Sequence, residues 1–494
     1  MTDNRLMIGA NTKENIPEYL FTETGELNIS DANKILSVTA EAVINSVDAL
    51  NNELRVNVTT TFKVIYDGED GVNSYAVKVD SNRAIMIEGV TTQTRAIVYA
   101  AVLDCEYAGA NSIKAKCTVQ LNGWYARENT LNFLNTELDD IFCKTSLLKV
   151  ENVEILPESK LSITYTNEAR LPISKMLDCA ANVYVNNVFA NSGSFQVEGE
   201  IALRMIFLSD NGEFMNQTFT NPFSAEIADE VVQPESSIDV YAQVNSIEVT
   251  LSAQDNRGFI SDINITLHSS VSNSQELEGI VDAYSTTNTL SVVEKKHNLD
   301  SLFCLRTVRD KVSTNAKIAN GINDVECVTG AMVNASSNIT NGVLQVEGVI
   351  TSTVIYQNEE GHLDSINVEL PFQTMVAKDI DCDTELATNV IVTSMFARIR
   401  TTSEIEVSAE IMISVKGKRS ASVNLVSDIE IGPEKEVDDV AISLYIVKPN
   451  QSIWEVAKDL NTSEAVIITQ NPELKLPVKA GDKVVLYKEI NFEI

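Results

Sequence analysis

The sequence predicts a mostly β protein: three tandem antiparallel β-rich repeats, each a sandwich or an open barrel, followed by a small βααβ domain. Two observations lead to this fold class. A long run of alternating apolar and polar residues occurs three times, beginning at Leu54, Phe195 and Leu344, so the copies are 141 and 149 residues apart. In the C-terminal region, two short helical patterns lie between two strand patterns, whereas few helical stretches precede them.

The alternating segments predict long strands that are buried on one face. They cover residues 54–66, 195–207 and 344–356, and a glycine follows five residues after each segment. Strict alternation indicates a half-buried antiparallel strand, and the glycine indicates a hairpin. The same alternation is clearest over residues 405–415, where Ile, Val and Ala alternate with Glu and Ser. Connections are short, so we expect antiparallel pairing throughout.

The repeats and the connecting segments set the predicted domain boundaries. Residues 140–151 resemble residues 282–294, which indicates a joining block after the first and second repeats; an acidic linker follows the third. The predicted divisions are an N-terminal segment 1–34, repeats 35–150, 151–300 and 301–431, an acidic linker 432–443 and a βααβ domain 444–489. A chain of 494 residues is long enough for several domains of this size.

The C-terminal domain is predicted from its strand and capping signals. A strand is expected at residues 445–447, followed by a Pro-Asn turn. Ser452 is the expected N-cap of a first helix, with Glu455 in the capping-box position three residues later. Ser463 is the expected cap of a second helix, which Asn471 and the following proline end. A Gly-Asp pair then turns the chain into the closing strand.

Composition and charge bear on the partners and the compartment. The net charge of −33 argues against nucleic acid or an anionic membrane surface as a direct partner. We find no apolar run of the roughly 20 residues that a transmembrane helix needs, and no secretory signal pattern at the start. The seven cysteines are scattered and never spaced C-x-x-C, which suits a reducing cytosol. We therefore expect a cytoplasmic protein.

No sequence motif indicates an enzyme. Nucleophile elbows, phosphate-binding loops, dinucleotide fingerprints and H-E-x-x-H pairs are all missing from the sequence. The three histidines, His268, His297 and His362, have no Cys or carboxylate spacing around them that suggests a metal site. We predict no catalytic residue, no metal and no cofactor. A hydrolase with an unfamiliar active site is the alternative, because carboxylates are abundant.

Two further groups of residues have more than one interpretation. The basic run Lys416-Gly417-Lys418-Arg419 is predicted at a hairpin tip, as a polar turn or as a contact for an anionic membrane or an acidic neighbour. Cys105 and Cys117 are predicted to be small buried residues, with a disulfide as the alternative if their strands are adjacent.

Three β-rich units followed by this βααβ end resemble the SPOCS-domain proteins of spore-forming Clostridia, whose chains end in a LysM domain. The family includes a spore coat morphogenetic protein that docks the ATPase of the coat basement layer. The resemblance implies a non-enzymatic scaffold of the spore coat in the mother-cell cytosol, at the forespore surface. It also implies the basement-layer ATPase or other coat proteins as partners, and no nucleic acid.

LysM domains bind N-acetylglucosamine polymers or, in some proteins, dock other proteins. The Gly-Asp-Thr that usually follows the first LysM strand is Asn450-Gln451-Ser452 in this chain, which favours protein docking. Binding of peptidoglycan or spore-cortex glycan is the alternative. Trp454, Ile453 and Leu486 are interpreted as core residues, although Ile453 is also a candidate for the groove, and Ser452 is interpreted as a helix cap. The candidate groove lies between two loops, with Asn450, Gln451, Ser452 and Ile453 in the first and Gln470, Asn471, Pro472 and Leu474 in the second.

Overall fold

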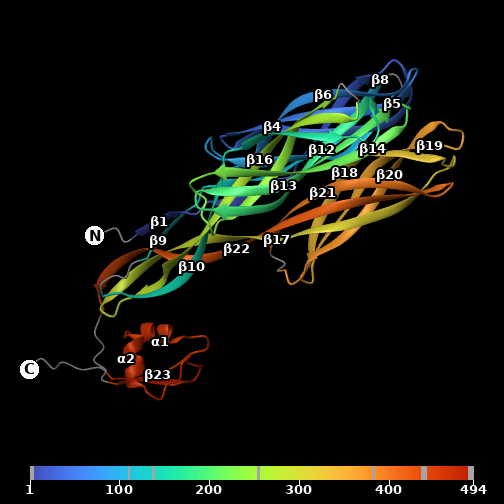
Figure 1. Ribbon diagram of the computed structural model, residues 1–494. Coiled ribbons are helices and arrows are strands. Elements are labelled where there is room, and N and C mark those ends of the chain that lie inside the picture. The colour runs from blue at the N-terminus through green and yellow to red at the C-terminus, as the bar shows by residue number, and fades with distance from the viewer. Residues whose placement is uncertain are drawn as a thin grey trace, which may run out of the picture.

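The computed structural model describes residues 5–109, 112–135, 140–252, 256–380, 384–435 and 442–487, and the side chains of all of these except 5 and 302–306. Residues 436–441 of the predicted acidic linker, residues 1–4 and residues 488–489 lie outside the described residues. The described chain is almost entirely antiparallel β structure with two short helices, as the sequence predicts. Figure 1 shows three β units at one end of an elongated molecule and a small helical domain at the other.

Each repeat is built around six strands, three in each of two facing sheets, and one sheet of repeat 1 and one of repeat 2 have a fourth strand. Along the chain, strands two, three and four form one sheet, and strands one, six and five form the facing sheet. The strands of repeat 1 are β3 (Tyr19–Asn28), β4 (Ala32–Leu50), β5 (Glu53–Gly68), β6 (Gly71–Met86), β7 (Ala96–Ala108) and β8 (Ser112–Arg127). Those of repeat 2 are β11 (Ser159–Glu168), β12 (Ile173–Asn191), β13 (Ser194–Ser209), β14 (Phe214–Ala228), β15 (Ser237–Leu251) and β16 (Gly258–Tyr284). Those of repeat 3 are β17 (Asn288–Lys317), β18 (Asp324–Thr340), β19 (Val343–Gln357), β20 (Leu363–Ala377), β21 (Glu385–Thr401) and β22 (Glu404–Glu434).

The three alternating segments of the sequence are the central strands β5, β13 and β19, each followed by a hairpin. Their apolar side chains point into the sandwich, where Val56, Val197 and Val346 are fully buried at equivalent positions. Each sandwich has its own hydrophobic core, drawn from both of its sheets. The alternation predicted these strands because the period of two places every second side chain on the core face.

Repeat 1 begins earlier than residue 35. Its first strand, β3, pairs with β8 along its whole length, and the short strand β2 (Thr12–Asn15) pairs with the end of β8. Residues 12–28, which the sequence analysis places in the N-terminal segment, therefore belong to the sheets of repeat 1. Their pairing partner lies about a hundred residues later, a long-range relation that local periodicity does not reveal.

A stalk continues the three sandwiches toward the C-terminal domain. It consists of three two-stranded ribbons, one for each repeat: β1 (Arg5–Gly9) with β9 (Thr130–Leu134), β10 (Phe142–Ile155) with the end of β16, and the start of β17 with the end of β22. Gly279 lies where the ribbons meet. A Cβ atom at this position would be 3.0 to 3.3 Å from Leu148, Leu425 and Phe133, one residue from each ribbon. The predicted joining blocks supply strands of this stalk.

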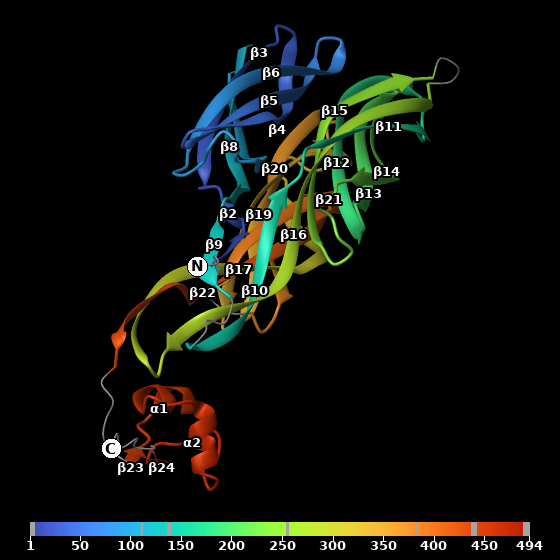
Figure 2. The ribbon, with the colours of Figure 1, turned by 90° about the vertical axis from the view of Figure 1, so that its left-hand side faces the viewer.

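The three sandwiches also meet one another through equivalent positions. Leu36, Leu177 and Cys327 pack together with Ile65, Ile206 and Ile355 in one buried cluster. The members of each set are separated by the same 141 and 149 or 150 residues as the repeated strands. Equivalent residues of the three repeats thus surround a common axis, and Figure 2 shows the three sandwiches diverging from the stalk.

The C-terminal domain has the predicted βααβ order. Its elements are β23 (Ile442–Ile446), α1 (Ile453–Asp459), α2 (Glu464–Gln470) and β24 (Lys483–Tyr487), with β23 and β24 antiparallel. Trp454 and Leu486 are buried, which confirms their interpretation as core residues. Within the described residues, neither helix is long and apolar enough to cross a membrane.

Candidate functional site

The first predicted loop is held by its own hydrogen bonds. Asn450 adopts the left-handed backbone conformation, with φ of 63°, which asparagine tolerates better than most residues. The Gln451 side-chain oxygen accepts hydrogen bonds from the Lys448 backbone N–H (2.9 Å) and the Tyr445 hydroxyl (3.0 Å). The Ser452 backbone N–H donates to Glu455 (2.7 Å). Although burial acts in the opposite direction, the hydrogen bonds from Ser452 lower the pKa of Glu455 to about 2.

The second predicted loop is bound to the closing strand. The Gln470 amide donates to the Tyr487 carbonyl (3.1 Å) and accepts from the Tyr487 N–H (2.7 Å). The Asn471 amide makes the same pair of hydrogen bonds to Val485, at 2.7 and 2.8 Å. The two side-chain amides thus hydrogen-bond to the backbone of β24 in the way that a neighbouring strand would. Sequence reasoning assigned both residues to a ligand groove and missed this structural role.

A depression of about 560 Å³ lies beside the second loop. Residues 470–475 line it together with Pro477, Lys479, Asp482, Lys483, Val485 and Tyr487. Pro472 and Leu474 are in this wall, and Leu474 also packs against the domain core. None of the four first-loop residues, 450–453, lines the depression, and Ile453 packs against the core instead. The structure therefore does not bring the two predicted loops together in one pocket.

The outer face of the β23–β24 sheet is mainly apolar, with Lys483 opposite Ile446 as its charged residue. Ile442, Leu444, Ile446 and Tyr487 are each 57 to 63% exposed, and we refer to these four residues as the apolar sheet face. Ile442 lies directly opposite Tyr487 in the ladder, and the alternate β23 residues Ser443 and Tyr445 are less exposed. A cluster of exposed large apolar side chains on a domain this small is typical of an interaction site.

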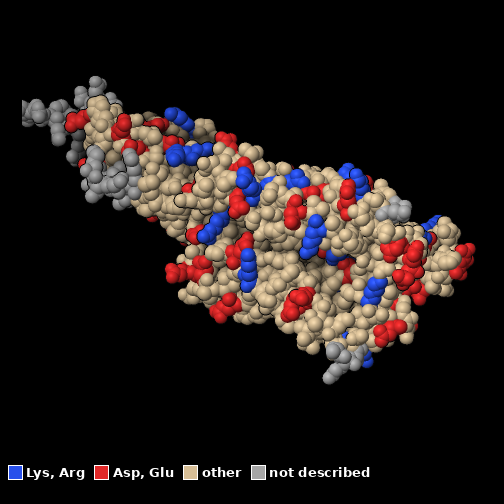
Figure 3. Space-filling view, turned by 90° about the horizontal axis from the view of Figure 1, so that it is seen from above, with Lys and Arg blue, Asp and Glu red and all other residues tan. Residues whose placement is uncertain are grey.

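Charge distinguishes the C-terminal domain from the repeats. Residues 442–487 contain five lysines and five carboxylates, so the domain has no net charge, whereas the whole chain carries −33. The excess acid therefore belongs to the rest of the chain. On the face of the molecule in Figure 3, acidic and basic side chains are interspersed over the repeats.

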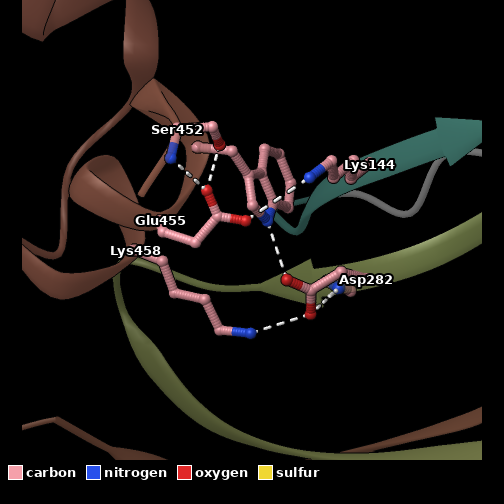
Figure 4. A network of polar contacts seen from close by, with 7 residues as sticks. Lys144, Asp282, Ser452, Glu455 and Lys458 are labelled. Atoms are coloured by element: carbon pink, nitrogen blue, oxygen red, sulfur yellow. Dashed lines mark hydrogen bonds and ion pairs between the residues drawn. The ribbon is translucent and has the colours of Figure 1, made fainter. Parts of the chain in front are cut away.

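Helix α1 attaches the C-terminal domain to the end of the repeat 2 ribbon (Figure 4). The Asp282 carboxylate, at the end of β16, accepts hydrogen bonds from the Trp454 indole N–H and the Lys458 ammonium, both at 2.7 Å. The Lys144 ammonium of β10 lies 3.4 Å from the Glu455 carboxylate. These contacts join two elements of the stalk to one face of α1.

Aromatic packing lies beside this polar network. The Tyr284 ring meets Trp454 edge-on, with centroids 4.9 Å apart, and stacks on Phe142 at 5.2 Å. The Tyr284 hydroxyl donates to the Thr462 carbonyl (2.8 Å). Tyr284 is thereby part of the hydrophobic core of the C-terminal domain, although it belongs to repeat 2. The core of this small domain is completed by a side chain from another unit.

The turn that follows Tyr284 makes a further contact with the C-terminal domain. The Lys435 ammonium donates to the Ser285 carbonyl (2.6 Å) and to the Asn461 side chain (2.7 Å). The Asn461 amide donates in turn to the Thr286 carbonyl (2.7 Å). Carboxylate, aromatic and backbone contacts to one segment thus fix the orientation of the domain. The stalk residues that make these contacts, Asp282 to Thr286, lie within the joining block predicted at residues 282–294.

The basic run at residues 416–419 is not a turn. β22 continues through it and pairs with β17 on one side and β21 on the other. Lys418 is buried and lies within 3.4 to 3.7 Å of Glu14, Asp300 and Glu385. The predicted hairpin tip is wrong because a glycine within a long strand was interpreted as a turn signal, whereas pairing on both sides keeps Gly417 extended.

Cys117, His268 and His297 are buried, Cys105 is partly buried and His362 is exposed. Cys105 and Cys117 face each other across β7 and β8, and both are free thiols. Burial raises the pKa of each thiol to about 12, so both are protonated at neutral pH. His268 and His297 lie on different strands, and burial lowers the pKa of both. Among the described residues, no group of three or more His, Cys, Asp or Glu side chains could hold a metal ion.

Comparison with known families identifies part of repeat 1. Residues 31–109 match a family model described as SipL, SPOCS domain. The match covers β4 to β7, which correspond to β12–β15 and β18–β21 in the other two repeats. It supports the SPOCS-domain part of the resemblance and is compatible with a non-enzymatic role in sporulation. No curated protein and no solved structure matches the chain.

Proposed function

We propose that the chain is a non-enzymatic scaffold of spore coat morphogenesis. In this proposal the C-terminal LysM-like domain docks a protein of the coat basement layer, and the three β repeats supply further protein contacts at the forespore surface in the mother-cell cytosol. The observation that carries the proposal is the apolar sheet face. The domain that bears it has no net charge, and the stalk holds the domain in a fixed orientation.

A fixed orientation suits docking. The partner meets a face that is already rigid, so little conformational entropy is lost when it binds. Burial of a large aliphatic side chain contributes roughly 1.5 to 3 kcal/mol, so three such residues and a tyrosine are enough for a specific contact. The absence of net charge lets an acidic partner approach this domain more readily than it approaches the repeats.

The identity of the partner rests on the resemblance to SPOCS-domain proteins. We propose the ATPase of the coat basement layer, or another coat protein, as the occupant of the apolar sheet face. The repeats make binding multivalent. Once one contact has formed, the effective concentration of the partner near the other repeats is higher, so each further weak contact forms more readily. The free thiols of Cys105, Cys117, Cys179 and Cys327 are compatible with a reducing compartment.

Glycan binding is the second candidate, and the depression beside residues 470–475 favours it. Its wall includes the polar side chains of Lys475, Lys479 and Asp482 and the ring of Tyr487. Against it, the amides of Gln470 and Asn471 are already engaged by the backbone of β24. A sugar would have to compete with those hydrogen bonds for the same donors and acceptors.

Binding of the purified full chain to the purified basement-layer ATPase tests the proposal. Leu444→Glu places a charge in the apolar sheet face and is expected to weaken binding at least tenfold. Leu147→Glu is the matched control, because Leu147 is also highly exposed but lies on the stalk. Equal loss in both variants, or no loss in either, would count against the apolar sheet face. Saturable binding of chitin oligosaccharides, unaffected by Leu444→Glu, would establish the glycan alternative instead.

A further inference from the structure

A cavity of about 310 Å³ lies where the three sandwiches meet. Residues of all three repeats line it, and the apolar part of its wall exceeds the polar part. Tyr99 and Trp124 come from repeat 1, Tyr241 and His268 from repeat 2, and Ile391 and Met412 from repeat 3. This volume is at the lower end of the range for small-molecule sites, roughly 300 to 1,000 Å³.

One part of the cavity wall is positively charged. The ammonium groups of Lys13 and Lys416 share a single carboxylate, Asp239, with Lys13 at 3.1 Å. The Lys13 ammonium also lies 3.9 Å from the centre of the Trp124 ring. In total, three lysines and two carboxylates line the cavity, in a chain whose net charge is −33. Because Glu14 and Asp300 also lie near Lys418, the three lysines have four carboxylates nearby, and an excess of positive charge is confined to Lys13 and Lys416 beside Asp239.

The two amines that share Asp239 are incompletely neutralised. Lys418 has three carboxylates nearby, Glu14, Asp300 and Glu385, whereas Lys13 and Lys416 have one between them. Burial and the repulsion between Lys13 and Lys416 lower the pKa of Lys416 to about 7. Burial and the nearby Lys418 lower the pKa of Lys13 to about 8. A second anion beside these amines would offset both effects.

Part of the Lys416 side chain is accessible to a ligand in the cavity. Lys416 is in β22, which is paired with strands on both sides, yet 38% of its side-chain surface is accessible. Because Lys416 lines the cavity, this surface faces the interior space between the repeats. His268 also lines the cavity and is only 8% exposed, and its Nε2 atom has no hydrogen-bond partner among the described residues.

The aromatic wall is continuous with the charged part. The Tyr99 and Tyr241 rings are 5.2 Å apart, and Tyr241 is 5.9 Å from the ring of His268. Neither tyrosine hydroxyl takes part in any of the hydrogen bonds found among the described side chains at this cavity. Tilted aromatic rings beside two ammonium groups form a surface that suits a flat or aliphatic body attached to an anionic group.

We propose that this cavity binds a small amphipathic anion, with its carboxylate, sulfonate or similar group beside Lys13 and Lys416 and its apolar body against Tyr99, Trp124 and Tyr241. Because all three repeats contribute to the wall, the ligand binds their assembled arrangement and stabilises it by mass action. This site is separate from the apolar sheet face of the C-terminal domain and does not depend on the docking proposal.

The probe for the test is 8-anilinonaphthalene-1-sulfonate, compared with the uncharged N-phenyl-1-naphthylamine, which has the same aromatic body. The chain has two tryptophans, so the full chain with Trp454→Phe retains Trp124 as its single tryptophan reporter. We expect saturable one-to-one binding of the sulfonate, quenching of Trp124 and at least tenfold weaker binding of the uncharged analogue. Equal affinity for the two probes would overturn the anionic part of the proposal.

Two further measurements locate the site. Lys416→Gln is expected to weaken sulfonate binding about tenfold, and Lys114→Gln, a highly exposed lysine on β8, is the charge-matched control. Without any substitution, the affinity should fall as the pH rises above 7 to 8, because the sulfonate stays charged while Lys416 and Lys13 lose their protons. An affinity that is independent of pH, or that Leu444→Glu abolishes, would place the probe elsewhere and overturn the proposal.

Discussion

The molecule has two kinds of junction, and they are built differently. The three repeats meet through buried apolar side chains at equivalent positions, including Leu36, Leu177 and Ile206. The C-terminal domain meets the stalk through two carboxylates, two lysines and the packed aromatic side chains of Phe142, Tyr284 and Trp454. The first junction is mainly apolar but also contains ion pairs between repeats, such as Lys63 with Asp178, whereas the second combines a polar network with the packing of Tyr284 on Trp454.

The difference between the two junctions shows which contacts the fold requires and which it can lose. Apolar contacts between repeats cannot be exposed without a large cost in free energy, so the three sandwiches and the stalk behave as one unit. Polar contacts exchange protein partners for water at modest net cost. Substitutions in the polar part of the second junction are therefore expected to release the C-terminal domain while the repeats stay folded. Four substitutions test this division, beginning with the largest expected effect.

Ile206→Ala removes a fully buried side chain from the junction of the three repeats. We expect the free energy of unfolding to fall by roughly 2 to 5 kcal/mol, because the transfer free energy is lost and a cavity remains. Urea unfolding followed by circular dichroism measures the change. Leu147→Ala, at an exposed stalk position, is the control and should change stability by less than about 0.5 kcal/mol. A similarly small effect for Ile206→Ala would show that the repeats are independent.

Gly279→Leu introduces a side chain at the point where the three ribbons of the stalk meet. The new Cβ would lie 3.0 Å from Leu148 and 3.1 Å from Leu425, closer than ordinary packing allows. We expect a loss of about 1 to 3 kcal/mol from overpacking, or more if the ribbons separate. The substitution should also displace the C-terminal domain, whose seat is on the stalk, and small-angle scattering would detect that displacement. An unchanged scattering profile and an unchanged stability would mean that the ribbons do not pack together in solution.

Asp282→Asn tests the polar junction. It removes the charge that accepts hydrogen bonds from Trp454 and Lys458, and hydrogen bonds to charged groups contribute about 1.5 to 3 kcal/mol each when buried. Asp282 is partly exposed, so we expect a total of about 1 to 3 kcal/mol. The loss should appear as release of the C-terminal domain, seen as red-shifted Trp454 fluorescence, with the urea transition of the repeats unchanged. A lowered repeat stability instead would mean that the two junctions are coupled.

Sequence periodicity predicted the strands well and their long-range pairing poorly. The central strands β5, β13 and β19 follow from alternation, because a half-buried strand imposes a period of two on the sequence. The sequence alone places β3 outside repeat 1, because its partner β8 lies about a hundred residues away and no local pattern indicates that pairing. Ile65, Ile206 and Ile355 are 141 and 149 residues apart, the same intervals as the repeated strands; this is a signal of the common axis, although it is visible only once the strands are aligned.

The candidate site shows a similar division. Capping residues and core residues of the C-terminal domain, such as Ser452 and Trp454, could be assigned because helix ends and small cores have local signatures. The roles of Gln470 and Asp282 could not, because their partners are fixed by tertiary structure. Lys416 was misassigned for the same reason: a basic residue beside a glycine predicts a turn unless the neighbouring strands are known.

Lys144→Gln should have the smallest effect and gives the finest test of the polar junction. The Lys144 and Glu455 side chains are each about 40% exposed, so their ion pair at 3.4 Å is screened by solvent and contributes at most about 1 kcal/mol. The substitution should leave Trp454 fluorescence unchanged at low salt and should add little to the effect of Asp282→Asn. If Lys144→Gln alone releases the C-terminal domain, the ion pair rather than the Asp282 carboxylate determines how the domain is seated. In that case raising the salt concentration should release the domain of the unsubstituted chain as well, because screening weakens an exposed ion pair far more than it weakens the aromatic contact of Tyr284 with Trp454.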